Sequence, residues 1–147
     1  LLIIHDHYVF SINEMNINIL KSKLHRAIIT DVHLDYEGSC AIDTNILQAA
    51  GIHEYEMIHI YNLNNGNRFS TYAIKAEKNS GVITLNGAAA FKGKKNDLVI
   101  ICTYAQIKES LVSKHKPKLI YFKKNNNVID TIKSKIPIQK KNNVISI

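Results

Sequence analysis

The stretch that decides the fold is MIHIYNLNNGNRFSTYAI, residues 57–74. Its two halves, 57–61 and 68–74, are rich in the β-branched and aromatic residues that favour strands. Asn65-Gly66 lies between them, and an Asn-Gly pair supplies the positive φ angles of a tight hairpin turn. The sequence therefore predicts a β-hairpin across residues 57–74.

Four other short apolar runs, each bounded by turn residues, also predict strands, which brings the expected number to six. They are residues 24–30, 81–85, 98–103 and 119–122, and a loop is expected at 124–127. Because these strands follow one another closely and no long amphipathic helix separates them, we expect a small, mainly β barrel rather than an alternating α/β sheet.

Two short helices are also expected. The first spans Asn45–Ala50, with Asp43 or Thr44 as its N-terminal cap and Gly51 as its left-handed C-terminal cap. The second spans residues 105–113, where apolar residues recur at helical spacing.

The composition indicates one domain. A chain of 147 residues that is 46% hydrophobic can bury one core and is too short for two ordinary domains. The net charge of +7 comes largely from lysines in the C-terminal third, which form no stripe interleaved with aromatic residues. We therefore interpret residues 140–147 as a solvated basic tail and expect no nucleic-acid partner.

Two cysteines, Cys40 and Cys102, have neither metal-ligand spacing nor further partners, so we expect no metal site and a reducing, cytoplasmic location. The apolar run at residues 1–4 falls far short of a membrane span, and no membrane partner is expected. Because Met15 begins a segment that resembles an ordinary start, we expect residues 1–14 to be an extension outside the fold.

The strongest chemical signal is Tyr36-Glu37-Gly38-Ser39-Cys40. A serine hydroxyl can attack the preceding glycine carbonyl to give an ester; elimination then gives dehydroalanine, and hydration releases ammonia and leaves a pyruvoyl group. Glycine suits the acceptor side because it lacks a Cβ and tolerates unusual backbone angles. Most Gly-Ser pairs are ordinary turns, so this pair alone does not establish self-cleavage.

The hairpin adds a cation and a phenol on one face. Alternation along a strand places Arg68 and Tyr72 together, where Arg68 could bind a carboxylate and Tyr72 could deliver a proton. A surface arginine beside a half-buried tyrosine is the plainer alternative. The same alternation places Lys23 and His25 on one face of the strand that precedes the Gly-Ser pair, where either side chain could simply be solvated or structural.

A run of small residues follows another expected strand. Asn86-Gly87-Ala88-Ala89-Ala90 lets backbone amides approach a ligand or a reacting carbonyl closely. Such runs also occur where a chain must simply pack tightly.

Taken together, these segments resemble the pyruvoyl-dependent aspartate 1-decarboxylases. The resemblance covers residues 15–139, and its motifs are Lys23-Leu24-His25-Arg26, Tyr36 to Asp43, Asn65 to Tyr72, and Asn86 to Ala90, in the order and spacing of that family. The family commonly has a Gly-Asp turn where this chain has Asn96-Asp97; asparagine tolerates left-handed angles, so we expect the turn to survive.

The resemblance implies a six-stranded double-psi β-barrel that assembles as a homotetramer with active sites between subunits. It implies autocatalytic cleavage between Gly38 and Ser39, which would give a β chain ending at Gly38 and an α chain beginning with a pyruvoyl group made from Ser39. This group would form a Schiff base with the amine of L-aspartate, and no metal or pyridoxal phosphate would be required. The product would be β-alanine for pantothenate synthesis.

The resemblance also assigns roles to residues. Ser39 would be the precursor of the cofactor and Tyr72 the proton donor. The other roles are self-processing by Gly38, Thr71 and Asn86, substrate binding by Arg68, Lys23, His25, Gly87, Ala88 and Ala89, and lining of the site by Tyr36. Three matters stay open: whether an accessory maturation factor is required, which substrate carboxylate Lys23 and Arg68 each bind, and whether the chain is instead an uncleaved barrel with a structural or nucleic-acid-binding role.

Overall fold

The computed structural model describes residues 14–142, which fold into a mainly β structure with a few short helices, as expected. The expected extension, residues 1–14, lies outside the described residues except for its last position, and so do residues 143–147 of the tail. The elements are β1 (Asn16–Ile28), β2 (Asp31–His33), β3 (Cys40–Asp43), α2 (Thr44–Ala50), β4 (Met57–Asn62), β5 (Arg68–Ala76), β6 (Ile83–Asn86), the 3-10 helix η1 (Gly87–Lys92), β7 (Leu98–Lys108), the 3-10 helix η2 (Glu109–Lys114), β8 (Lys118–Phe122) and β9 (Ile129–Lys133).

The described residues form nine strands where the sequence predicted six. The additional strands are β2, β3 and β9, which have three to five residues each and are too short to stand out as apolar runs. All nine lie in one sheet of order β2-β6-β3-β5-β4-β7-β1-β8-β9. Parallel pairs join β1 to β8, β2 to β6 and β3 to β5, so strands distant in sequence are brought side by side.

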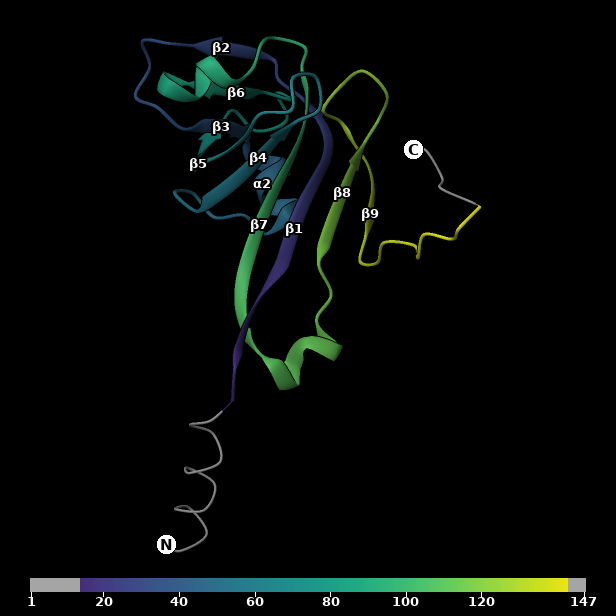
Figure 1. Cartoon of the computed structure of the whole chain (residues 1–147). Coiled ribbons are helices and arrows are strands. Elements are labelled where there is room, and N and C mark those ends of the chain that lie inside the picture. The colour runs from purple at the N-terminus through teal and green to yellow at the C-terminus, as the bar shows by residue number, and fades with distance from the viewer. Residues whose placement is uncertain (1–13, 143–147) are drawn as a thin grey trace, which may run out of the picture.

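The strands β1 and β7 form a long antiparallel ribbon (Figure 1). The strands β2 to β6 gather at one end of this ribbon, and β8 and β9 run alongside β1. The helix predicted at residues 105–113 is wrong in its first half, because 105–108 continue β7. Ala105 pairs with Ile19 and Ile107 with Ile17, and these backbone bonds override the helical spacing of the apolar side chains. Only residues 109–114 turn, as the 3-10 helix η2.

The predicted hairpin is confirmed as β4 and β5, with Tyr61 opposite Arg68. Its turn is wider than a two-residue Asn-Gly turn. The Asn62 amide donates to the Asn67 carbonyl at 2.9 Å, and Gly66 has a φ of +77° whereas Asn65 does not have a positive φ. The loop therefore spans four residues and needs the left-handed conformation only at its glycine.

The sheet has a buried face and an outer face. Leu24, Ile58, Ile60, Ala73 and Ile101 are fully buried in the core together with residues of β3, β6 and α2. Because side chains alternate along a strand, the residues between them point the other way. Cross-strand pairing aligns Lys23, Cys102, His59 and Ser70 in one row across β1, β7, β4 and β5, and we call this side the outer face.

The predicted caps and turns form at both ends of the short helix and before β7. The Asp43 carboxylate, rather than Thr44, caps α2 by accepting from the Asn45 amide at 2.8 Å, and Gly51 ends the helix with a φ of +68°. Asn96 takes the left-handed conformation with a φ of +74°, so the turn before β7 is kept. Within residues 14–142, the helices are too short to cross a membrane.

Candidate active site

The Gly38-Ser39 bond lies between two residues with left-handed backbone angles. The φ angle is +75° at Gly38 and +83° at Ser39. The Gly38 amide donates to the Tyr36 carbonyl at 2.7 Å, which forms a tight turn directly before the bond. A positive φ at a serine is a conformation of higher energy, by about 1–3 kcal/mol, and it persists only where the surroundings enforce it. The turn at this Gly-Ser pair is therefore a strained one.

Gly87, at the N-terminus of η1, packs closely against Gly38, the residue before this bond. A Cβ added at Gly87 would lie 2.8 Å from the Gly38 Cα and 2.9 Å from the Gly38 nitrogen, both closer than side chains approach backbone atoms. Gly87 also has a φ of +61°. The run of small residues thus makes one close approach, to the backbone of Gly38.

The Ser39 hydroxyl is buried and unused. The residue is 3% exposed, and its Oγ has no hydrogen-bond partner among the described residues. A buried hydroxyl without a partner is uncommon, because it loses its hydration without compensation. The Ser39 carbonyl is fixed, since the backbone N–H of Asn86 donates to it at 2.9 Å. The Ser39 backbone is thus held in place, while its hydroxyl makes no hydrogen bond to the described residues.

The neighbouring thiol cannot compete with this hydroxyl. Cys40 follows Ser39 directly, is fully buried in the core, and belongs to the ladder of β3 with β5 and β6. Burial raises the pKa of the Cys40 thiol to about 12, so it stays protonated at neutral pH. Since the thiolate is the reactive form of cysteine, the thiol is chemically inert here.

A cavity of about 340 Å³ opens beside the Gly38-Ser39 bond. Its lining includes all the residues predicted for self-processing and catalysis, together with two of those predicted to bind substrate: Gly38, Ser39, Thr71, Tyr72 and Asn86, with Ala88 and Ala89. The Tyr72 hydroxyl donates to the Glu37 carbonyl at 3.2 Å, which places the phenol next to the same peptide segment. Phe69, Ser70 and Lys92 complete the lining, and no role was predicted for them.

Arg68 and Lys23 lie on the outer face and do not line this cavity. The Arg68 guanidinium stacks on the Tyr61 ring, 3.8 Å from its centroid. Both cations act on the thiol of Cys102: burial raises the pKa of this thiol, and the charges of Lys23 and Arg68 oppose that rise. The two predicted carboxylate-binding residues thus lie on β1 and β5, with β4 and β7 between them, and neither lines the Ser39 cavity.

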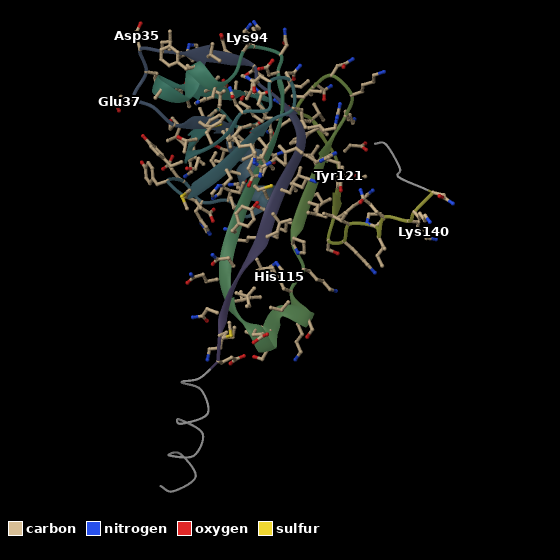
Figure 2. The ribbon with its side chains drawn as sticks, viewed as in Figure 1. Asp35, Glu37, Lys94, His115, Tyr121 and Lys140 are labelled. Carbon is tan, nitrogen blue, oxygen red and sulfur yellow. The ribbon has the colours of Figure 1, made fainter. Side chains whose placement is uncertain are left out.

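His25 and Tyr36 also lie outside the Ser39 cavity. His25 lines a separate cavity of about 310 Å³ and contacts the ring of Tyr121, with ring centroids 5.3 Å apart. Tyr121 lies on β8 (Figure 2). Burial, with the nearby charges of Lys23 and Arg26, lowers the pKa of His25 to about 4, so it is neutral at pH 7. The Tyr36 side chain is 58% exposed.

Another cavity, of about 530 Å³, has Asp43, Gly81 and Asn127 in its walls. Its polar groups bind one another: the Asp43 carboxylate accepts from three backbone amides, and the Asn127 side chain bonds to the backbone of Ile28 and Gly81. These contacts hold β1, β3 and the segment before β6 together, so we assign this region a structural role.

The fold and the site define a class: a small, mainly β protein that holds a free serine hydroxyl beside a strained glycyl bond. Comparison with known proteins makes the assignment specific. The family profile described as Aspartate decarboxylase matches residues 15–129. Proteins named aspartate 1-decarboxylase from Hydrogenovibrio crunogenus, Nitrosococcus oceani and Azotobacter vinelandii are 55%, 56% and 54% identical over 125 residues, which is 85% of this chain and 96%, 98% and 98% of theirs. The chain belongs to the aspartate decarboxylase family.

Proposed function

We propose that this protein decarboxylates L-aspartate to β-alanine and carbon dioxide, after cleaving its own backbone between Gly38 and Ser39. The observation that carries the proposal is the buried Ser39 hydroxyl, which has no hydrogen-bond partner and adjoins a bond with positive φ angles on both sides. This arrangement has a destabilised backbone and an uncommitted nucleophile at the position where the family resemblance requires them.

Self-processing begins when the Ser39 Oγ attacks the Gly38 carbonyl carbon. The carbon–nitrogen bond breaks, the hydroxyl proton passes to the nitrogen, and an ester joins Gly38 to the Ser39 side chain. Loss of the Ser39 Cα proton expels the Gly38 carboxylate and leaves dehydroalanine. Water then adds, ammonia leaves, and a ketone remains at the new N-terminus. Thr71, in the wall of the same cavity, is suited to donate to the oxyanion of the first step.

The residues around Ser39 fit a pyruvoyl group. The backbone N–H of Asn86 donates a hydrogen bond to the Ser39 carbonyl. At Gly87 there is room only for a hydrogen, because a side chain there would collide with Gly38. When present, the pyruvoyl group supplies an electron sink for the electron pair released as carbon dioxide leaves. Ala88 and Ala89 keep the cavity open for substrate, and the Tyr72 hydroxyl is positioned at its wall to donate the proton that completes β-alanine.

Substrate binding in this proposal uses a second copy of the chain. Arg68 and Lys23 supply the cations that match the two carboxylates of aspartate, but in one chain they do not line the Ser39 cavity. A homotetramer with active sites between subunits would bring these cations, with His25 and Tyr36, to a cavity of a neighbouring copy. Either cation, Lys23 or Arg68, could bind either of the two carboxylates of aspartate.

The remaining features of the proposal concern the domain. We assign residues 15–139 to one double-psi barrel within the nine-stranded sheet, which the three parallel strand pairs support. We further propose that residues 1–14 and the basic residues 140–147 lie outside this domain. We also propose that the protein acts in the cytoplasm. The proposed self-cleavage is compatible with an accessory maturation factor and does not require one.

Denaturing mass spectrometry of aged protein, with an assay of carbon dioxide release from L-aspartate, tests the proposal. We expect two fragments that meet at the Gly38-Ser39 junction, with a ketone at position 39. Ser39→Ala should remove both the cleavage and the activity while the thermal unfolding transition persists. An intact backbone in a sample that releases carbon dioxide would overturn the cofactor assignment, and an intact, inactive chain would favour an uncleaved barrel.

A further inference from the structure

A chain of aromatic contacts on the outer face leads to Arg68. Arg68 on β5 stacks on the ring of Tyr61 on β4, and the Tyr61 hydroxyl lies 2.8 Å from the Tyr104 hydroxyl on β7. The Tyr104 ring in turn meets His59 edge to face, with centroids 5.2 Å apart and planes at 84°. The contacts thus connect three adjacent strands in the order β5, β4, β7.

The stacking leaves the hydrogen-bond donors of Arg68 free. An arginine on an aromatic ring presents its N–H groups in the plane of the guanidinium, where a carboxylate accepts two of them. Within residues 14–142, no carboxylate forms an ion pair with Arg68. The guanidinium is therefore arranged for an external carboxylate, and the Tyr61 ring sets the plane in which it is presented.

The Tyr61 side chain is connected to β7 through Tyr104. Both tyrosines lie on the outer face, where no core packing surrounds them, and Tyr104 is 43% exposed. The hydrogen bond between the two hydroxyls is the polar contact that connects the Tyr61 side chain to β7. The edge-to-face contact with His59 holds the Tyr104 ring from the other side. Loss of one hydroxyl would free the ring on which Arg68 stacks.

We propose that Tyr104 is a positioning residue, which acts through Tyr61 to hold the Arg68 guanidinium in the orientation that binds a substrate carboxylate. This rests on the proposed function, in which Arg68 binds aspartate. Tyr104 touches neither the Ser39 cavity nor the Gly38-Ser39 bond, so it has no part in self-processing.

The test removes the hydroxyl and keeps the ring. Tyr104→Phe should raise the KM for aspartate about 2- to 12-fold, the range expected for loss of one ordinary hydrogen bond. The kcat and the rate of cleavage at Gly38-Ser39 should not change. Tyr55→Phe is the matched control, because Tyr55 is 72% exposed and lies outside these contacts, and it should change neither constant.

A double-mutant cycle distinguishes positioning from general packing. If Tyr104 acts through the Tyr61 hydroxyl, Tyr61→Phe should raise KM by the same factor, and the double variant should raise it no further. Tyr61→Phe also removes the bond from the other side should Tyr104→Phe fold poorly. Multiplicative effects of the two substitutions, or a fall in kcat with KM unchanged, would overturn the proposal.

A binding measurement keeps this test separate from the decarboxylase assignment. Succinate carries two carboxylates and no amine, so its dissociation constant can be measured by calorimetry on assembled, uncleaved Ser39→Ala protein. Adding Tyr104→Phe should weaken succinate binding by the same factor as KM. An unchanged dissociation constant would refute the role of Tyr104 and leave the decarboxylase assignment untouched. If the decarboxylase assignment is itself wrong, the protein without substitutions will release no carbon dioxide from L-aspartate.

Discussion

Gly87 packs against Gly38, and Gly87→Ala is predicted to slow the proposed cleavage between Gly38 and Ser39. An alanine at a φ of +61° costs about 1–2 kcal/mol in backbone strain. Its Cβ would also lie 2.8 Å from the Gly38 Cα, and relieving such a contact costs about 1–3 kcal/mol more because backbone, not a flexible side chain, has to move. The backbone that moves carries the Gly38 carbonyl, which is the proposed acceptor of the acyl shift.

Gly66→Ala is the matched control. Gly66 has a φ of +77°, and an added Cβ there would have no atom within 4 Å. Both variants therefore carry the same backbone strain, and only Gly87→Ala displaces Gly38. If the additional 1–3 kcal/mol is lost in the transition state of the acyl shift, cleavage slows about 5- to 150-fold relative to Gly66→Ala.

The assay is a time course of the fraction cleaved, measured by denaturing mass spectrometry on freshly synthesised protein, with thermal unfolding recorded on the same samples. We expect both variants to lose stability and only Gly87→Ala to lose cleavage rate. Equal cleavage rates in the two variants would refute the reasoning, because the contact with Gly38 would then have no bearing on the reaction.

Three further predictions concern burial and hydrogen bonding. The pKa of His25 is lowered to about 4, so between about pH 6.5 and pH 4 the unfolded chain binds a proton that the folded protein does not bind. The stability of the fold should therefore decrease as the pH drops from 6.5 toward 4. In thermal unfolding curves, His25→Gln should make this decrease smaller. Asp43→Ala removes an acceptor of three backbone amides and should lower the free energy of unfolding in denaturant by about 3 kcal/mol, whereas Asp31→Ala at an exposed site should change it by less than about 0.5 kcal/mol. Cys40, with its pKa raised to about 12 by burial, should resist alkylation at pH 8 until the protein unfolds; rapid labelling of the native protein, detected by peptide mass, would contradict its assigned inertness.

Local features of the fold could be predicted from the sequence because they depend on a few adjacent residues. The hairpin at 57–74, the cap of α2 and the left-handed turn at Asn96 follow from backbone preferences that act within a single turn. The helix at 105–113 failed for the complementary reason: its apolar spacing also suits a strand, and pairing with β1 decided between them. The short strands β2, β3 and β9 have too few residues to leave a pattern.

By itself, the sequence determined which chemistry the chain carries, since a Gly-Ser pair, a cation and a phenol at family spacing are chemical identities that need no coordinates. Only the tertiary structure decided how these groups meet. It places Gly87 against Gly38, leaves the Ser39 hydroxyl without a partner, and keeps Arg68 on the opposite side of the sheet from the core. These relations join segments far apart in the chain, and they arise from the order in which β6, β3 and β5 pair, which no short stretch of sequence encodes.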